Sequence, residues 1–250
     1  MKAVILAGGF AKRLGELGKN MPKALLPVAD TPIIEHILRM IEPITQIDQI
    51  FISTNKRFEE HFKQWLNGID NSKIDLIVEP AMEEGQKLGS IGALQFLIEQ
   101  KNIDDDLLVI NGDNMFDLNL RDFINFYNER GSFSFCVYDT HNINEARKMG
   151  VVLLDQNDVV MDFEEKPENP KSTKVSTGIY IFPRNNLPMI KQYIDEGNTP
   201  DRPGDLLIWM MKKQKLNAFS FEGKWFDIGS TETYEQAQKE YAKEITSKRF

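Results

Sequence analysis

The sequence predicts an α/β protein built on a Rossmann-like, doubly wound and mostly parallel sheet. Short apolar runs recur in the first half of the chain and alternate with amphipathic helical segments. Several of these runs end in glycine, asparagine or aspartate, which turn the chain at strand ends. The 250 residues, 41% of them apolar, suffice for one sizeable core. We therefore expect a single domain over residues 1–250.

The first strand, residues 3–7, ends in a glycine pair. Gly8-Gly9 leads into a segment with four basic side chains: Lys12, Arg13, Lys19 and Lys23. Backbone N–H groups can approach a phosphate where no Cβ intervenes, and the cations neutralise its charge. The alternative interpretation is a tight turn followed by a solvated basic loop.

Two standard phosphate-binding patterns are absent from this segment. A Walker A loop needs a glycine at Arg13 and a serine or threonine at Asn20. The dinucleotide fingerprint needs a glycine at Phe10 or at Ala11. The sequence therefore favours neither a P-loop NTPase nor a Rossmann dehydrogenase.

The next helix is predicted with Thr31 as its cap and Pro32 at its first position. Its apolar face comprises Ile33, Ile34, Ile37, Leu38 and Ile41. His36 lies off this face, so we expect a surface histidine.

Strands at residues 49–54 and 75–80 flank a helix at 58–69. A glycine-rich loop and helix follow at 83–94, and a strand beginning at 106 ends in Asn111-Gly112-Asp113. Ligands of such sheets bind outside the carboxyl ends of the strands. A carboxylate there, Asp113, is suited to Mg²⁺, although an ordinary turn aspartate is the alternative.

The second half predicts a small antiparallel subdomain. After a helix at 120–130 and a strand at 133–139, three strands follow closely between Gly150 and Phe182, with a turn at 156–158. Leu206, Leu207, Met210 and Met211 are expected in the core. A last strand precedes a final helix capped near Ser230 or Thr231.

Composition excludes several classes. The net charge of −8 argues against a nucleic-acid-binding surface. No apolar run approaches the ~18 residues of a membrane span, and Met1-Lys2 leads into a strand rather than a signal peptide, so we expect a cytoplasmic protein. Cys136, the single cysteine, is expected as a buried strand thiol. Three scattered histidines make a zinc site unexpected.

The chain resembles the sugar-1-phosphate nucleotidyltransferases in its short form, without a C-terminal β-helix. The segments LAGGFAKRL and MPKALLPV resemble the family's GGxGTRL and PKPLLPV. Ala11 and Lys12 stand where the family usually has glycine and threonine, while Arg13 and Lys23 keep their places. The segments LGSIGAL, NGD, MGVV, FEEKP, STGIYIF and WFDIGS also match, in the family's order, up to about Tyr234.

The resemblance implies roles for individual residues. Catalytic roles fall to Arg13, Lys23 and Lys166. Nucleotide binding falls to Leu6, Ala7, Gly8, Gly9, Gln86, Gly89, Ser90, Asn111 and Gly112. Sugar binding falls to Gly150, Glu165, Lys166, Thr177 and Gly178, and Mg²⁺ binding to Asp113 and Asp227. Residues 1–140 would mainly bind the nucleotide, 141–230 the sugar, and 231–250 would form the C-terminal helix.

The implied reaction joins a nucleoside triphosphate and a sugar 1-phosphate into an NDP-sugar and pyrophosphate. One alternative is a non-catalytic nucleotide-sugar-binding regulatory subunit, and a more distant one is a metal-dependent glycosyltransferase. The sequence leaves the base and the sugar open, with LGSIGAL weakly favouring guanylyl- and uridylyl-type enzymes. The family is often dimeric or tetrameric, but no interface is evident in the sequence.

Overall fold

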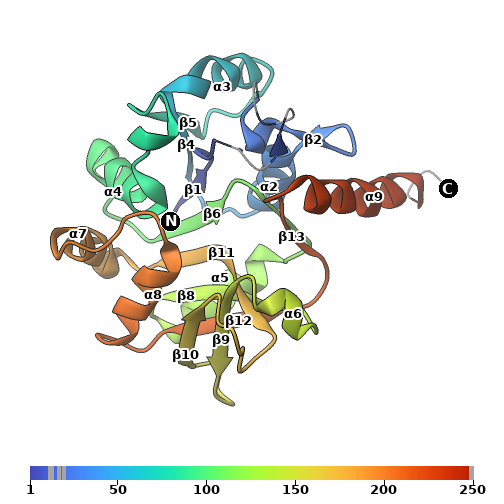
Figure 1. Cartoon of the computed structure of the whole chain (residues 1–250). Coiled ribbons are helices and arrows are strands. Elements are labelled where there is room, and N and C mark those ends of the chain that lie inside the picture. Colours follow the sequence, from blue (N-terminus) through green and yellow to red (C-terminus); the bar gives the residue numbers. More distant parts are fainter. Residues whose placement is uncertain (11–13, 16–17, 19–20, 248–250) are drawn as a thin grey trace.

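The computed structural model describes residues 1–10, 14–15, 18 and 21–247. Its centre is β1 (Lys2–Leu6), which lies between β6 (Leu107–Asn111) and β4 (Gln49–Asn55) and is parallel to both. β5 (Ile74–Glu79) continues the parallel array beyond β4. The predicted α/β fold with a mostly parallel core is thereby confirmed (Figure 1).

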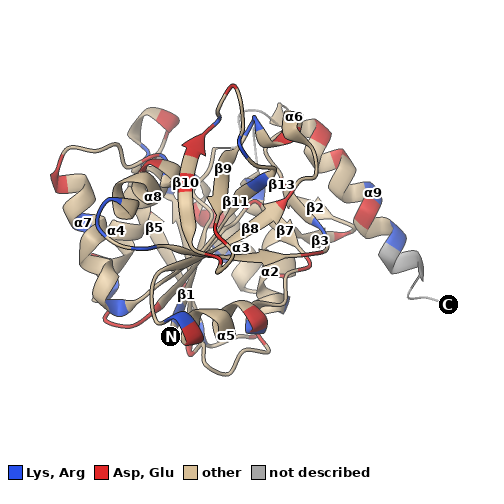
Figure 2. Cartoon of the chain, turned by 90° about the horizontal axis from the view of Figure 1, so that it is seen from below, with Lys and Arg blue, Asp and Glu red and all other residues tan. Residues whose placement is uncertain are grey.

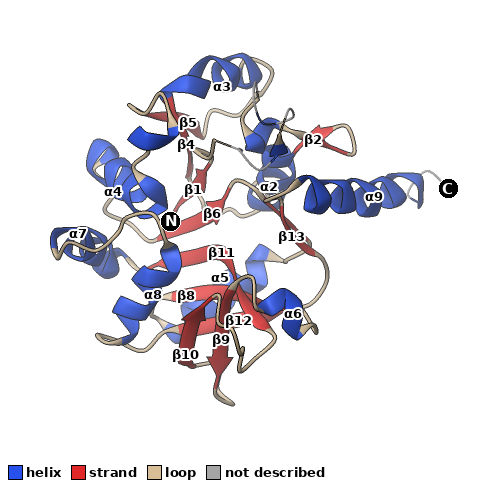
Figure 3. Cartoon of the chain, in the orientation of Figure 1, coloured by secondary structure: helices blue, strands red, loops and turns tan. Residues whose placement is uncertain are grey.

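The second half of the chain extends the same sheet with antiparallel strands. β11 (Lys174–Phe182) runs antiparallel to β6, and β8 (Ser134–Asp139) and β9 (Gly150–Leu154) pair antiparallel with β11. β10 (Val160–Glu165) forms a hairpin with β9, and β12 (Asn217–Phe221) pairs with β8. The described residues thus form one nine-stranded sheet (Figure 3).

Helices cover both faces of the sheet because successive strand residues point to opposite sides. Ala3 and Ile5 belong to one apolar cluster and Val4 to another. The first cluster contains the buried faces of α2 (Ile33–Ile41), α3 (Glu59–Leu66) and α5 (Leu120–Arg130). The second contains those of α4 (Gly89–Lys101), α7 (Leu187–Asp195) and α8 (Pro203–Met211).

The remaining elements are short or terminal. They are α6 (Ile143–Ala146), α9 (Thr231–Ser247), the pair β2 (Pro27–Val28) and β3 (Thr31–Pro32), and the pair β7 (Asn114–Phe116) and β13 (Trp225–Asp227). Single 3-10 turns lie at Lys23–Leu25, Lys56–Phe58, Glu84–Gln86 and Arg184–Asn186. None of the described helices is long and apolar enough to cross a membrane.

Two predictions around α2 are wrong. Thr31 does not cap the helix; it pairs with Val28 in the β2–β3 ladder, and the first helical N–H, on Ile33, donates to the Leu26 carbonyl. His36 is half-buried rather than on the open surface. Its Nε2 lies 3.0 Å from the Val28 carbonyl oxygen, and the ring of Tyr241 covers it edge-on.

The C-terminal helix α9 clasps the β2 turn and then projects from the body (Figure 1). The Tyr234 hydroxyl donates to the Pro27 carbonyl at 2.6 Å, and Gln238 bonds both that carbonyl and the Ala29 N–H. The Thr233 N–H donates to the Ser230 hydroxyl, which confirms the predicted cap at Ser230.

Leu206, Leu207 and Met210 are buried as predicted, whereas Met211 is only partly buried against the core. The surface is mixed in charge. Cys136 is fully buried in β8, and burial raises the pKa of its thiol. Figure 2 shows acidic and basic residues interspersed over the described part of the chain, with no continuous basic face in that view.

Candidate active site

A cavity of about 190 Å³ opens at the carboxyl ends of β1 and β6. Ten of the residues predicted to bind nucleotide, phosphate or metal line it: Leu6, Ala7, Gly8, Gly9, Lys23, Gly89, Ser90, Asn111, Gly112 and Asp113. Five further residues complete the lining: Ala24, Glu79, Lys87, Ala93 and Asp201. The parallel core therefore brings together segments that are far apart in the sequence, as expected at strand ends.

Backbone hydrogen bonds and one buried amide fix the floor of the cavity. The Asn55 side chain donates to the Gly8 carbonyl at 3.0 Å, and the Gly112 N–H donates to the Leu6 carbonyl at 2.9 Å. A Cβ at Gly112 would lie 2.9 Å from that same carbonyl oxygen. A glycine is therefore required where the two strands separate.

Lys23 and Asp113 form an ion pair in the cavity wall. The Lys23 Nζ lies 2.7 Å from the Asp113 Oδ2, and the two side chains are 14% and 29% exposed. Lys23 begins a 3-10 turn, and Asp113 lies two residues after the end of β6. Arg13, the other predicted cation of this segment, lies outside the described residues.

Asp113 and Asp227 are brought together by the β7–β13 ladder. Asp227 pairs with Asn114, and the Ile228 N–H donates to the Asp113 carbonyl at 2.9 Å. Within the described residues, no group of three or more histidine, cysteine, aspartate or glutamate side chains is arranged to hold a metal ion. Asp113 lines the cavity, whereas Asp227, exposed at the end of β13, is not among the lining residues.

Asn114 ties this ladder to β11, and the sequence analysis did not identify it. Its side chain is 1% exposed. The amide nitrogen donates to the Thr177 carbonyl at 2.8 Å, and the amide oxygen accepts from the Trp225 indole at 3.0 Å. Asn114 therefore fastens the β7–β13 ladder to β11 at Thr177.

Thr177 and Gly178 lie next to the cavity floor rather than in its lining. The Thr177 hydroxyl donates to the Cys136 carbonyl at 3.0 Å, so its side chain is committed to the sheet. Gly178 has φ +78°, and a Cβ there would lie 2.3 Å from the Asn111 amide nitrogen. Only a glycine lets β11 pass this close to Asn111.

The other predicted sugar-side residues gather where β10 meets α8. A Cβ at Gly150 or at Gly204 would meet both the Phe163 ring and the Glu165 carboxylate. Glu165 therefore lies between two glycines, while Lys166, with φ +48°, is 65% exposed and 3.7 Å from Glu165. None of these five residues, nor Thr177 or Gly178, lines the described cavity.

Gln86 also lies outside the cavity lining. Its side chain accepts from the Met82 N–H at 2.9 Å and approaches Glu83, so it closes its own loop. Lys87, from the same stretch, reaches the cavity and bonds Glu84 and Asp201 at 3.0 and 3.1 Å. Burial opposes the charge of Lys87, but these two bonds outweigh it and raise its pKa.

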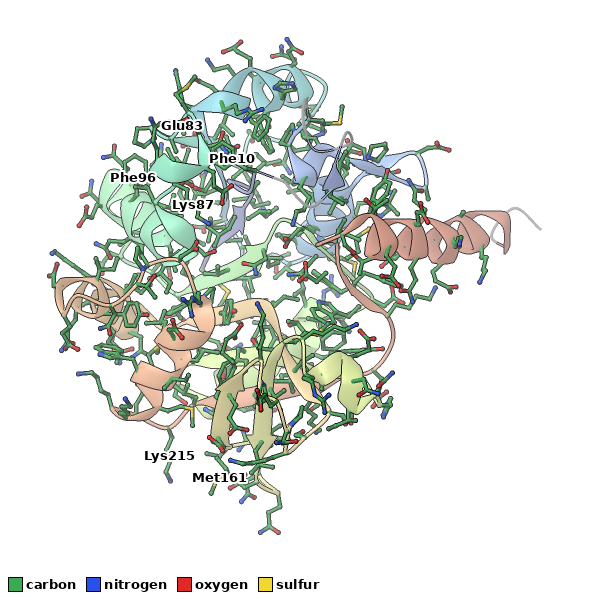
Figure 4. The ribbon with its side chains drawn as sticks, in the orientation of Figure 1. Phe10, Glu83, Lys87, Phe96, Met161 and Lys215 are labelled. Carbon is green, nitrogen blue, oxygen red and sulfur yellow. The ribbon has the colours of Figure 1, made fainter. Side chains whose placement is uncertain are left out.

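The link through Asp201 joins two distant segments. The Pro200 carbonyl accepts from the Ile91 N–H at 2.9 Å, and a Cβ at Gly89 would lie 2.5 Å from that carbonyl. The segment before α8 is thus fastened to the start of α4. Figure 4 shows Lys87, Glu83 and Phe10 in one region of the molecule, far from Met161 and Lys215.

Glu79 is a cavity residue that the sequence analysis did not identify. It ends β5, is 4% exposed, and accepts from the Ser53 hydroxyl at 2.9 Å. Burial raises the pKa of its carboxyl group, and the Ser53 bond offsets part of that effect. The available signal was a charged residue at the end of an apolar strand, next to a proline.

Comparisons with known proteins show which family the chain resembles. Two curated relatives are a UTP–glucose-1-phosphate uridylyltransferase of Synechocystis, 31% identical, and a bifunctional protein GlmU of Methanocaldococcus jannaschii, 29% identical. The alignments cover 95% and 92% of this chain but only 62% and 51% of those proteins. The chain thus spans between about half and two thirds of their length.

A solved structure has the same fold over nearly the whole chain. It is a putative glucose-1-phosphate thymidylyltransferase of Bacillus anthracis in complex with a sucrose, 26% identical, with a TM-score of 0.82. The match covers 97% of this chain and 95% of that one. The family profile described as "Nucleotidyl transferase" matches residues 2–244. The chain belongs to the nucleotidyl transferase family.

Proposed function

We propose that this chain transfers a nucleotidyl group from a nucleoside triphosphate to a sugar 1-phosphate, giving an NDP-sugar and pyrophosphate. The observation that carries the proposal is the cavity at the ends of β1 and β6. There the backbone of Gly8-Gly9 lies beside the Lys23–Asp113 ion pair, in a chain of the nucleotidyl transferase family.

In the proposed reaction, a phosphate oxygen of the sugar 1-phosphate attacks the α-phosphorus in line. The bond between the α-phosphorus and its bridging oxygen to the β-phosphorus breaks, and its electron pair leaves with pyrophosphate. A phosphate dianion is already a nucleophile, so positioning and charge neutralisation suffice. The absence of histidine from the described cavity lining is compatible with this chemistry.

Each proposed catalytic side chain neutralises phosphate charge. The backbone of Gly8 and Gly9 leaves room for the nucleotide to approach, and the Lys23 ammonium balances the charge of its phosphates. Arg13 is predicted to assist Lys23. Lys166, on the exposed end of β10, is proposed to hold the attacking phosphate of the sugar.

The donor set of Asp113 and Asp227 fits Mg²⁺. This ion prefers hard oxygen ligands and often takes only one or two carboxylates, with substrate phosphates and water completing its shell. When bound there, the ion would supply positive charge to the phosphate oxygens. In this structure the Lys23 ammonium already lies against the Asp113 carboxylate, which supports a role for this carboxylate in holding a cation.

We further propose that residues 1–140 mainly bind the nucleotide and 141–230 the sugar, with 231–250 as the C-terminal helix. Of the fifteen described residues that line the cavity, Asp201 alone comes from beyond residue 140. This distribution supports a nucleotide site built from the first part of the chain. A cytoplasmic setting stays a prediction from the sequence.

The test is pyrophosphate release across a grid of nucleoside triphosphates and sugar 1-phosphates with Mg²⁺. Asp113→Asn serves as the blank, and Asp122→Asn, on the exposed face of α5, as a control for the loss of one charge. We expect release in a few wells, abolished in Asp113→Asn and kept in Asp122→Asn. Nucleotide-sugar binding without release in any well would instead indicate a regulatory binding protein.

A further inference from the structure

The cavity contains a buried carboxylate, Glu79, that the proposed transfer reaction does not use. One of its oxygens, Oε1, accepts from the Ser53 hydroxyl and lies 3.1 Å from where a Cβ on Gly8 would be. The carboxylate therefore reaches from the end of β5 to the glycine pair after β1. A carboxylate has about four acceptor positions, so one serine leaves most of them open.

No described cation balances this carboxylate. Lys23 pairs with Asp113, and Lys87 pairs with Glu84 and Asp201. Burial is accordingly the main influence on the Glu79 pKa, and none of the described charged groups contributes to it appreciably. Burying a carboxylate without a partner costs free energy, which N–H donors from a bound ligand would offset.

Glu79 and the Lys23–Asp113 pair approach the cavity from opposite sides of β1. The strand order is β6, β1, β4, β5: Asp113 comes after β6, whereas Glu79 ends β5 and reaches back as far as Gly8. Lys23 and Asp113 lie at the β6 end, where the proposed function puts the phosphates. A nucleotide bound in this direction carries its base toward Glu79.

We infer that Glu79 reads the base of the nucleotide and selects guanine. This inference rests on the proposed function for the direction of the nucleotide. An ionised carboxylate offers only acceptors. Guanine is the common base whose pairing edge presents two adjacent donors, N1–H and the N2 amino group, and so matches both carboxylate oxygens.

The other bases present at least one acceptor to the carboxylate. Adenine and cytosine have an amino group beside a ring nitrogen acceptor, and uracil and thymine have one N–H between two carbonyl oxygens. The named relatives do not decide the base, since one is a uridylyl- and another a thymidylyltransferase by name. The assignment of guanine therefore rests on the Glu79 carboxylate of this chain.

The discriminating substitution is Glu79→Gln. Glutamine replaces one acceptor by an amide donor, which opposes a guanine N–H but complements the N–H and carbonyl of uracil or thymine. Asp75→Asn is the matched control, because it removes one carboxylate at the opposite end of the same strand, where Asp75 pairs with Lys101 on the surface.

The experiment measures dissociation constants for GDP, ADP, CDP, UDP and dTDP with Mg²⁺ by calorimetry. We expect the wild type and Asp75→Asn to prefer GDP by about ten- to a hundred-fold, the discrimination typical of one bidentate contact. Glu79→Gln should lose that preference and bind UDP or dTDP more tightly. Thermal unfolding and circular dichroism of both variants establish that they are folded.

Each outcome separates this inference from the proposed reaction. Tightest binding of another base by the wild type, or an undiminished GDP preference in Glu79→Gln, overturns the guanine assignment. Pyrophosphate release with UTP and none with GTP would uphold nucleotidyl transfer and overturn the base. Selective GDP binding with no release from any sugar 1-phosphate would uphold the base and overturn the transfer. Binding of none of the diphosphates overturns the inference.

Discussion

At the scale of single residues, the cavity is organised by charges that occupy separate places. The Lys23–Asp113 pair lies on the β6 side of the cavity, and Glu79 lies on the β5 side without a described cation. The Lys87–Asp201 pair links the start of α4 to the segment before α8. Exposed ion pairs contribute little to stability. These pairs border a cavity, however, so we interpret them as charges that a phosphate or a metal ion can use.

Lys23→Gln should reduce the proposed turnover by about a hundred- to a thousand-fold, the cost typical of removing one donor that stabilises the transition state. The ammonium is 14% exposed and 2.7 Å from Asp113, so its loss removes the described cation of this wall without opening a core cavity. Steady-state pyrophosphate release measures the effect. Lys171→Gln, which breaks a surface pair with Asp162, should leave turnover unchanged.

Gly178→Ala should destabilise the protein more than Gly197→Ala. Both glycines have similar φ values, +78° and +84°, so both substitutions carry a backbone cost of about 1–2 kcal/mol. A Cβ at Gly197 meets nothing within 4 Å, whereas at Gly178 it lies 2.3 Å from the Asn111 amide. The extra cost should be about 1–3 kcal/mol in urea unfolding. Equal losses in the two variants would contradict this account.

At the scale of elements, the sequence predicted the long strands and helices better than the short connections. The runs that became β1, β4, β5 and β6 are continuous and apolar, so local pattern alone identifies them. The β7–β13 pair has three residues on each side and depends on partners about a hundred residues apart. Thr31 was assigned to a cap because its contact with Val28 is not visible in the local pattern.

The clasp of α9 on the β2 turn predicts that Gln238→Ala destabilises the protein by about 1–2 kcal/mol, because the Ala29 N–H loses its acceptor. The Pro27 carbonyl keeps the Tyr234 hydroxyl, which limits the loss. Gln236→Ala is the matched control, since Gln236 is exposed on the same helix. Urea unfolding of the two variants measures the difference, and losses of the same size would exclude the clasp as a source of stability.

At the scale of the whole molecule, the sheet assembles the site from segments that the sequence keeps apart. Glycines, Lys23 and Asp113 were predictable because each stands in a motif at a strand end. Asp201 was not, because its place depends on the contact between Pro200 and the start of α4. Glu79 has no motif of its own. Its place in the site can be inferred only from its burial and from the strand order, which bring it to the cavity.

Titration of Glu79 should contribute to the pH dependence of the protein's global stability. In the folded protein, the pKa of the Glu79 carboxyl group is raised above its ordinary value of 4.5. At pH values between 4.5 and the raised pKa, the native state therefore binds more protons than the unfolded state. The contribution of Glu79 to the free energy of unfolding therefore falls as the pH rises through this window. The other described charged residues of the cavity lining are identical in the two proteins compared below: Lys23, Lys87, Asp113 and Asp201.

Glu79→Gln has no such titration, so its stability relative to the wild type should increase with pH across that window. Urea unfolding of both proteins at several pH values between about 4 and 8 measures the difference. Saturating GDP should reduce the pH-dependent difference, because N–H donors favour the charged carboxylate. A stability difference that is constant with pH would mean that Glu79 is ionised at its ordinary pKa in the folded chain. Its burial would then not be the controlling influence.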